Sequence, residues 1–221
     1  MLHYSFHWRP VLATLPTMLV GCFVTIEIAA LSIIAGILLG ILLTQGHAGR
    51  HAPLRWIAQS WIEVARNTPA LFQIYMIYFG LGSFGLHLNS FLALTAGIAF
   101  NNAGYLAETF RGGLRAIPPT QSRAARSLGM TAPQGFRFIV LPQLFRIVYY
   151  PITNQMVWAI LMTALGLTVG LDSDLAGVTQ QFNVLTYRTF EYFSVAAVLY
   201  YLITKLLMLA SRLLAWRLFR Y

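Results

Sequence analysis

Residues 122–142 read SRAARSLGMTAPQGFRFIVLP, an arginine-rich stretch between two apolar parts of the chain. An Ala-Ala pair is followed after three residues by Gly129 and after nine more by Ile-x-Leu-Pro. Glycine can adopt the left-handed backbone geometry that ends a helix, and Thr131 can cap a second helix with Pro133 in its first turn. The stretch therefore predicts two short helices, the first over about 122–128, that meet at a sharp turn.

The composition places the chain in a lipid bilayer. Of its 221 residues, 58% are hydrophobic and 10% are charged, and the mean hydropathy is +0.67. A soluble domain would need more polar surface. The length fits a single transmembrane domain over residues 1–221. The net charge of +9 comes from arginines beside apolar spans, without the interleaved aromatic residues of a nucleic-acid surface, so no nucleic-acid partner is expected.

Five apolar segments predict an all-α, polytopic membrane fold, because each span needs about 20 mostly apolar residues. The spans are expected at about Thr17–Thr44, Trp56–Leu81, Ser90–Phe110, Leu144–Leu167 and Tyr192–Ala215. Cys22, the single cysteine, is expected to be a packing residue. The histidines lack the spacing of a metal site, so no metal is predicted.

Basic residues between the spans predict the orientation of the chain. Arginines follow the first and third spans and fill the C-terminal tail, whereas the other connections hold few positive charges. Because positive residues mark cytoplasmic segments, the N-terminus is expected outside and the C-terminus inside. The pair Asp172-x-Asp174 then falls outside, as a solvated loop or a contact with a binding protein.

The quoted stretch resembles the EAA loop of ABC-importer permeases, the cytoplasmic helix-turn-helix through which an ATP-binding subunit moves the transmembrane helices. The resemblance implies a coupling loop at about residues 115–142. The coupling residues that it implies are Arg123, Ala124, Ala125, Ser127, Leu128, Gly129, Met130, Thr131 and Pro142. The alternative for this loop is a basic hairpin that lies only against lipid headgroups.

Further motifs resemble the polar amino-acid uptake family of these permeases. They are the block AGYLAETFRGG at residues 103–113, Arg66-Asn67-Thr68-Pro69, Leu141-Pro142-Gln143 and Asn154-Gln155. The resemblance implies the type I importer permease fold in a bacterial cytoplasmic (inner) membrane. It also implies two ATP-binding subunits that use ATP and Mg, a second permease and a soluble binding protein, while this chain binds no cofactor and is not an enzyme.

The chain departs from the family pattern in two places. Arg123 stands where the EAA motif has a glutamate, which reverses a charge at the partner contact. The family's Lys-Asp-Thr-Ser-Leu is replaced at residues 161–165, so Met162 and Thr163 lie at positions near the translocation path in family members. The two missing charges favour a heterodimer of unlike permeases over a homodimer.

Polar residues inside spans are costly in lipid and are therefore candidates for function. The candidates for the substrate pathway are Glu27, Arg66, Asn67, Thr68, Asn101, Asn102, Met162 and Thr163. Some of them have a structural alternative. Glu27 can bond to hydroxyls on neighbouring turns, Glu63 can pair locally with Arg66, and the two asparagines can hold helices together. Pro69 predicts a kink in the second span, and the arginine beside it suits a substrate carboxylate.

These features predict a permease subunit of an ATP-driven importer for a polar amino acid, working by alternating access. The chain has no Gly-x-x-x-x-Gly-Lys-Ser/Thr loop, so ATP is expected to bind elsewhere. The alternative is a secondary transporter or channel without an ATPase. The absence of an internal repeat counts against that alternative.

Overall fold

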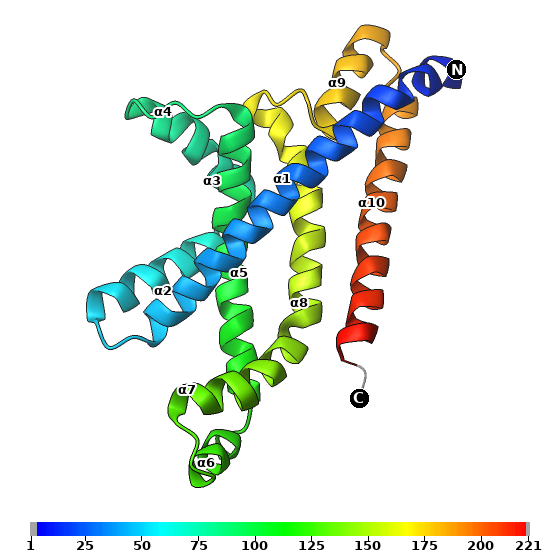
Figure 1. Cartoon of the computed structure of the whole chain (residues 1–221). Helices are drawn as coiled ribbons and strands as arrows, with labels where there is room; N and C mark the ends of the chain where they lie inside the picture. Colours follow the sequence, from blue (N-terminus) through cyan, green and yellow to red (C-terminus); the bar gives the residue numbers. More distant parts are fainter. Residues whose placement is uncertain (1–3, 220–221) are drawn as a thin grey trace.

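The computed structural model describes residues 4–219, and this part of the chain is all helical, without a strand. Figure 1 shows a bundle of long helices with short helices at both ends. The helices are α1 (Trp8–Ala48), α2 (Ala52–Asn67), α3 (Ala70–Tyr75), η1 (Met76–Gly80), α4 (Leu81–Ser83), α5 (Ser90–Ala116), α6 (Pro119–Ser127), α7 (Ala132–Gly135), η2 (Phe136–Val140), α8 (Leu141–Met162), η3 (Thr163–Val169), α9 (Leu175–Thr186) and α10 (Thr189–Leu218).

The first helix is longer than the sequence predicts. α1 has 41 residues, which corresponds to about 60 Å at 1.5 Å per residue. It crosses α5 and α8 diagonally in Figure 1. A β-carbon at Gly36 would lie 2.9 Å from Cβ of Asn102, and one at Gly40 would lie 3.0 Å from Cβ of Leu106. This small-xxx-small pair lets α1 and α5 approach closely, as in other membrane helix pairs.

The predicted second span is not one helix. α2 ends at Asn67, Thr68 and Pro69 are extended, and α3 begins at Ala70. The expected kink is therefore a complete break. Nε2 of Gln73 lies 3.0 Å from both the Ala65 and Thr68 carbonyl oxygens and 2.8 Å from the Thr68 hydroxyl. This amide satisfies backbone groups that the break frees, as burial in a membrane requires.

Three helical segments are long and apolar enough to cross a bilayer within residues 4–219. They are α1, the run Ala132–Val169 and α10. α5 has 27 residues but carries buried asparagines and charges, and α2 to α4 form a broken pair around the Thr68–Pro69 turn. The fourth predicted span begins earlier than expected, because α7, η2 and α8 form one continuous helical run.

The core lies where α1, α3, α5 and α8 meet. Ile28, Ile74, Leu94, Ile98 and Ile160 form its buried centre. A second cluster, which includes Cys22, joins α1 to α9 and α10, so the cysteine is a packing residue as predicted. The N-terminal end lies beside α9, and the C-terminal end lies on the side of α6 and α7 (Figure 1).

The connection after η3 contains a helix that the sequence analysis did not predict. Asp174 is fully buried and caps α9, because its carboxylate accepts hydrogen bonds from Gly177 N (3.0 Å) and Ala176 N (3.3 Å). Burial raises the pKa of the Asp174 carboxyl to about 6. The expectation of a solvated pair is therefore wrong for Asp174, although Asp172 is exposed.

Candidate functional site

The predicted helix-turn-helix is present at the end of the bundle that holds α6 and α7 (Figure 1). α6 ends at Ser127, and Gly129 has a φ of +85°, the left-handed geometry that an L-residue adopts only at a cost. The Met130 amide donates to the Ala125 carbonyl across this turn at 3.1 Å. Gly129 thus ends the first helix by the mechanism that its sequence position predicts.

The second helix starts as predicted. Thr131 and Gln134 form a capping box, in which the Thr131 amide donates to Oε1 of Gln134 at 2.8 Å and the Gln134 amide donates to the Thr131 hydroxyl at 3.4 Å. The π-helical turn η2 follows, directly before Pro142 in the first turn of α8. A π-turn is a wider turn that suits a proline inside a continuous helix. The second helix of the hairpin therefore continues into α8 without a break.

The nine residues assigned to this loop do not share one environment. Arg123, Ala124, Ser127 and Leu128 are exposed, and Leu128 presents 80% of its surface at the tip. Ala125 is buried between the two short helices, where a β-carbon on Gly135 would lie 3.3 Å from its own. The exposed residues are accessible at the tip of the hairpin, whereas Ala125 packs between α6 and α7.

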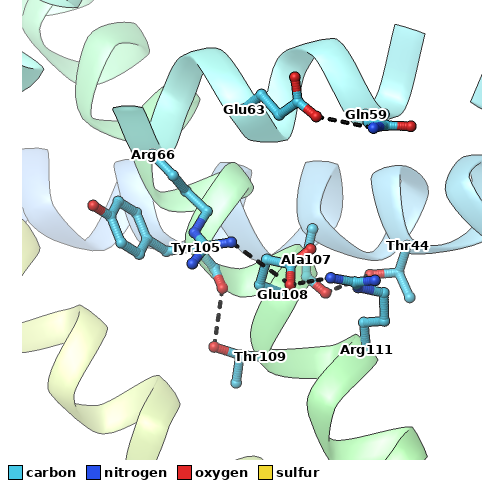
Figure 2. Close-up of polar contacts among 9 residues, drawn as sticks. All are labelled: Thr44, Gln59, Glu63, Arg66, Tyr105, Ala107, Glu108, Thr109 and Arg111. Carbon is cyan, nitrogen blue, oxygen red and sulfur yellow. Dashed lines mark hydrogen bonds and ion pairs between the residues drawn. The ribbon is translucent and has the colours of Figure 1, made fainter. Parts of the chain in front are cut away.

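A charged cluster joins α2 to α5 (Figure 2). The Glu108 carboxylate lies 3.6 Å from the Arg66 guanidinium and accepts a hydrogen bond from Arg111. The Arg66 guanidinium also lies 5.8 Å from the centre of the Tyr105 ring. Two cations therefore share one anion.

The expected local pair of Glu63 with Arg66 is wrong. Glu63 instead accepts a hydrogen bond from Gln59 at 2.9 Å, while Arg66 extends toward Glu108 on α5 (Figure 2). Spacing along α2 allowed the local pair, but the packing of α5 against α2 offers Arg66 a carboxylate that is already held in place by Arg111.

A polar cavity of about 260 Å³ lies against this cluster. His47, Glu63, Arg66, Asn67, Glu108 and Arg111 are among its lining residues. Nδ1 of His47 and Nε of Arg111 are buried and have no hydrogen-bond partner within residues 4–219. His47 lies beyond the end of the first predicted span at Thr44, but in the structure it belongs to the last turn of α1. Its position in the wall of this cavity follows only from the packing of α1 against α2 and α5.

Asn101 and Asn102 hold helices together. Nδ2 of Asn101 donates to the Ala65 carbonyl and to Oε1 of Gln73, both at 3.0 Å. Oδ1 of Asn102 accepts from Nε2 of Gln155 at 3.1 Å. One amide atom of each asparagine, Oδ1 of Asn101 and Nδ2 of Asn102, has no partner within the described part of the chain. These contacts agree with the structural alternative.

The remaining pathway candidates lie apart from one another. Glu27 is exposed on the surface of α1, and the expected bonds to neighbouring hydroxyls are wrong, because Thr25 accepts from Leu175 N and Ser32 donates to the Thr95 carbonyl. Thr163 is fully buried and donates to Ile160 O at 2.8 Å. Met162 packs against the core. Neither of these two faces an open cavity next to Arg66.

Comparison with known proteins identifies the family. The model of the family described as "Binding-protein-dependent transport system inner membrane component" matches residues 32–220. The chain belongs to this family. It is a multi-pass permease subunit of an ABC transporter, with the fold that the resemblance implied.

Relatives and solved structures of this permease family agree over nearly the whole chain. The arginine transport system permease protein ArtQ of Bacillus subtilis is 30% identical over 194 residues, covering 87% of this chain and 88% of the relative. The octopine transport system permease protein OccM of Rhizobium radiobacter is 31% identical over 223 residues, covering 97% and 89%. A crystal structure of an amino acid ABC transporter with histidines has a TM-score of 0.89 at 29% identity, covering 97% of this permease and all of that chain. The MetNI methionine ABC transporter, at 18% identity and a TM-score of 0.71, shares the fold.

Proposed function

We propose that this permease imports a polar amino acid, and that the α6–α7 hairpin transmits movement from an ATP-binding subunit to α8. The hairpin carries the proposal because it combines an exposed tip with a rigid connection to a span. The capping box and the uninterrupted run through η2 connect the start of α7 to α8 without an intervening loop, and only the short turn at residues 128–131 separates α7 from α6. Rigid-body movement of a partner is thereby converted into tilting of membrane helices.

The proposed assembly contains two ATP-binding subunits, a second permease and a soluble binding protein. ATP and Mg belong to the ATP-binding subunits. Arg123, exposed on α6, makes the docking surface more basic and suits an acidic site on its partner. The second permease is proposed to be an unlike chain. The bacterial inner membrane is the proposed location, with the α6–α7 end and the C-terminus in the cytoplasm.

The substrate class rests on the relatives and on the charged cluster. The names of the relatives refer to arginine, octopine, glutamine, and glutamate or aspartate. All these compounds carry a carboxylate next to an amino group. Because Arg111 keeps Glu108 paired, Arg66 can exchange Glu108 for a substrate carboxylate without leaving an isolated anion. Its side chain is 43% exposed, so it is accessible from the polar cavity.

The experiment for the assembly is to tag this chain, extract it in mild detergent and identify the proteins that co-purify in stoichiometric amount. An ATP-binding subunit supports the coupling proposal, and a second permease distinguishes a heterodimer from a homodimer. If the chain purifies alone, and collapse of the proton gradient stops uptake while ATP is maintained, the alternative of a secondary transporter replaces it.

The experiment for the substrate site compares R66A with R55A in reconstituted vesicles. Arg55 is an exposed arginine on the same helix, one that lies outside the charged cluster. R66A is expected to raise the KM for uptake, while R55A leaves it unchanged. Equal KM values for the two variants would contradict a role of Arg66 in binding the carboxylate.

A further inference from the structure

A groove runs between α8 and α10 on the side of the bundle away from the charged cluster. It has a volume of about 890 Å³. Its walls include Phe145, Leu214 and Leu218, each at least half exposed. Its floor is closed by hydrogen bonds, because the Tyr149 hydroxyl donates to the Ser211 carbonyl at 2.7 Å and the hydroxyls of Thr153 and Ser211 lie 2.7 Å apart. Hydrogen bonds thus join the two helices at the floor of the groove, and the groove opens toward the outside.

Arg146 lies in this groove without a carboxylate partner in the described part of the chain. Its guanidinium donates to the Phe219 carbonyl at 3.3 Å and lies 5.6 Å from the centre of the Phe219 ring. These contacts hold the side chain in place without neutralising it. Arginine remains charged at any accessible pH and forms bidentate bonds to phosphate. An anion is therefore the expected partner at this position.

Within residues 4–219, no acidic side chain lines the groove. The chain has no acidic residue between Glu108 and Asp172 and none after Glu191. Arg212 and Arg217 add two further exposed cations on the last turns of α10. Neither of these two arginines lines the groove, so Arg146 is the charged residue of its lining within residues 4–219, and most of the other lining residues are apolar.

We propose that the α8–α10 groove binds an anionic phospholipid, with an acyl chain along the apolar walls and the phosphate at Arg146. Charge complementarity carries the assignment, because a zwitterionic lipid would bring a cation together with its phosphate, and an apolar protein helix would leave Arg146 without a counter-charge. Basic sites between membrane helices on the cytoplasmic side bind such headgroups. This inference does not depend on the substrate or on the coupling role of the hairpin.

The position of the site links it to α8. Arg146 lies one turn after Pro142, on the helix that continues from the hairpin. A lipid that contacts both α8 and α10 would add to the direct contacts at this end, which are the hydrogen bonds of the groove floor and the contact of Arg146 with Phe219. The bound lipid would therefore stiffen the span that the hairpin moves.

The test uses the intact transporter complex in nanodiscs of dioleoylphosphatidylcholine with dioleoylphosphatidylglycerol. Native mass spectrometry then counts the phosphatidylglycerol molecules retained by wild type, R146A, A210F and R115A. Ala210 is exposed and lines the groove, so phenylalanine there fills the space and leaves every charge in place. Arg115, exposed on the last turn of α5, is the matched control outside the groove.

Wild type and R115A are expected to retain phosphatidylglycerol in preference to phosphatidylcholine. R146A is expected to retain about fivefold less, the effect typical of one basic residue near an anionic lipid. A210F is expected to lose the lipid while its unfolding midpoint stays that of wild type. Equal retention in all four proteins would overturn the proposal. Loss of a second permease from A210F, with lipid retention unchanged, would overturn it in favour of a protein interface.

Discussion

Replacement of Gly129 by alanine isolates the backbone geometry of the α6–α7 hairpin, for which we propose a coupling role. A β-carbon at Gly129 meets no atom within 4 Å, so the substitution causes no steric clash. Its φ of +85° nevertheless costs an L-residue about 1–2 kcal/mol. The substitution therefore destabilises the native turn relative to other conformations of the same residues. A penalty of 1–2 kcal/mol corresponds to a factor of about 5–30 in an equilibrium constant.

The matched control is G112A. A β-carbon at Gly112 also meets no atom within 4 Å, but Gly112 lies inside α5 with ordinary helical geometry, where alanine is favoured over glycine by roughly 0.5–1 kcal/mol. The affinity of the purified ATP-binding subunit for permease in nanodiscs is the measurement. G129A is expected to bind up to about 5–30-fold more weakly, and G112A as tightly as wild type.

G129N provides a graded test, because asparagine tolerates the left-handed region better than alanine. Its affinity is expected to lie between those of wild type and G129A. If G129A binds as tightly as G112A, the turn at Gly129 does not shape the docking surface. The hairpin would then not couple through the geometry of its turn.

Three further perturbations test the packing and charges of the bundle. A β-carbon at Gly104 would lie 2.5 Å from Cβ of Ala65, so G104A is expected to destabilise the α2–α5 contact by about 1–3 kcal/mol, and the double variant A65G/G104A to recover thermal stability. E108Q leaves two guanidinium groups without their anion and is expected to lower the unfolding midpoint, whereas R66A, which leaves Glu108 paired, is not. Because the pKa of Asp174 is raised to about 6, its carboxyl favours the folded state when protonated, and stability is expected to fall by up to roughly 3 kcal/mol as pH rises from about 4 to 6. D174N keeps the helix cap and is expected to remove this dependence in thermal unfolding at a series of pH values, and an unchanged slope would contradict the assignment.

The hairpin could be predicted from the sequence because its determinants are local. Gly129 ends one helix through its own backbone freedom, and Thr131 starts the next through a side chain that reaches three residues along the chain. The two apolar helices α1 and α10 were found for a similar reason, since hydropathy is a property of consecutive residues. Only their ends were misplaced.

The partners of the polar residues could not be predicted in this way. Arg66 pairs with Glu108, which is distant in the sequence, because the packing of α5 against α2 brings the two side chains together. The local alternative at Glu63 was equally compatible with helical spacing. Asp174 was expected in solvent, but the docking of α9 against α1 buries it.

The sequence by itself determined that this protein is a helical membrane permease with a hairpin of two short helices, because apolar length and turn chemistry are written in neighbouring residues. Only the tertiary structure decided that the second span is fully broken and that Gln73 secures the break. It also decided which cations share Glu108 and where Arg146 lies without a carboxylate. These features depend on how helices rotate and approach one another, and that arrangement is fixed by close packing between residues far apart in the chain.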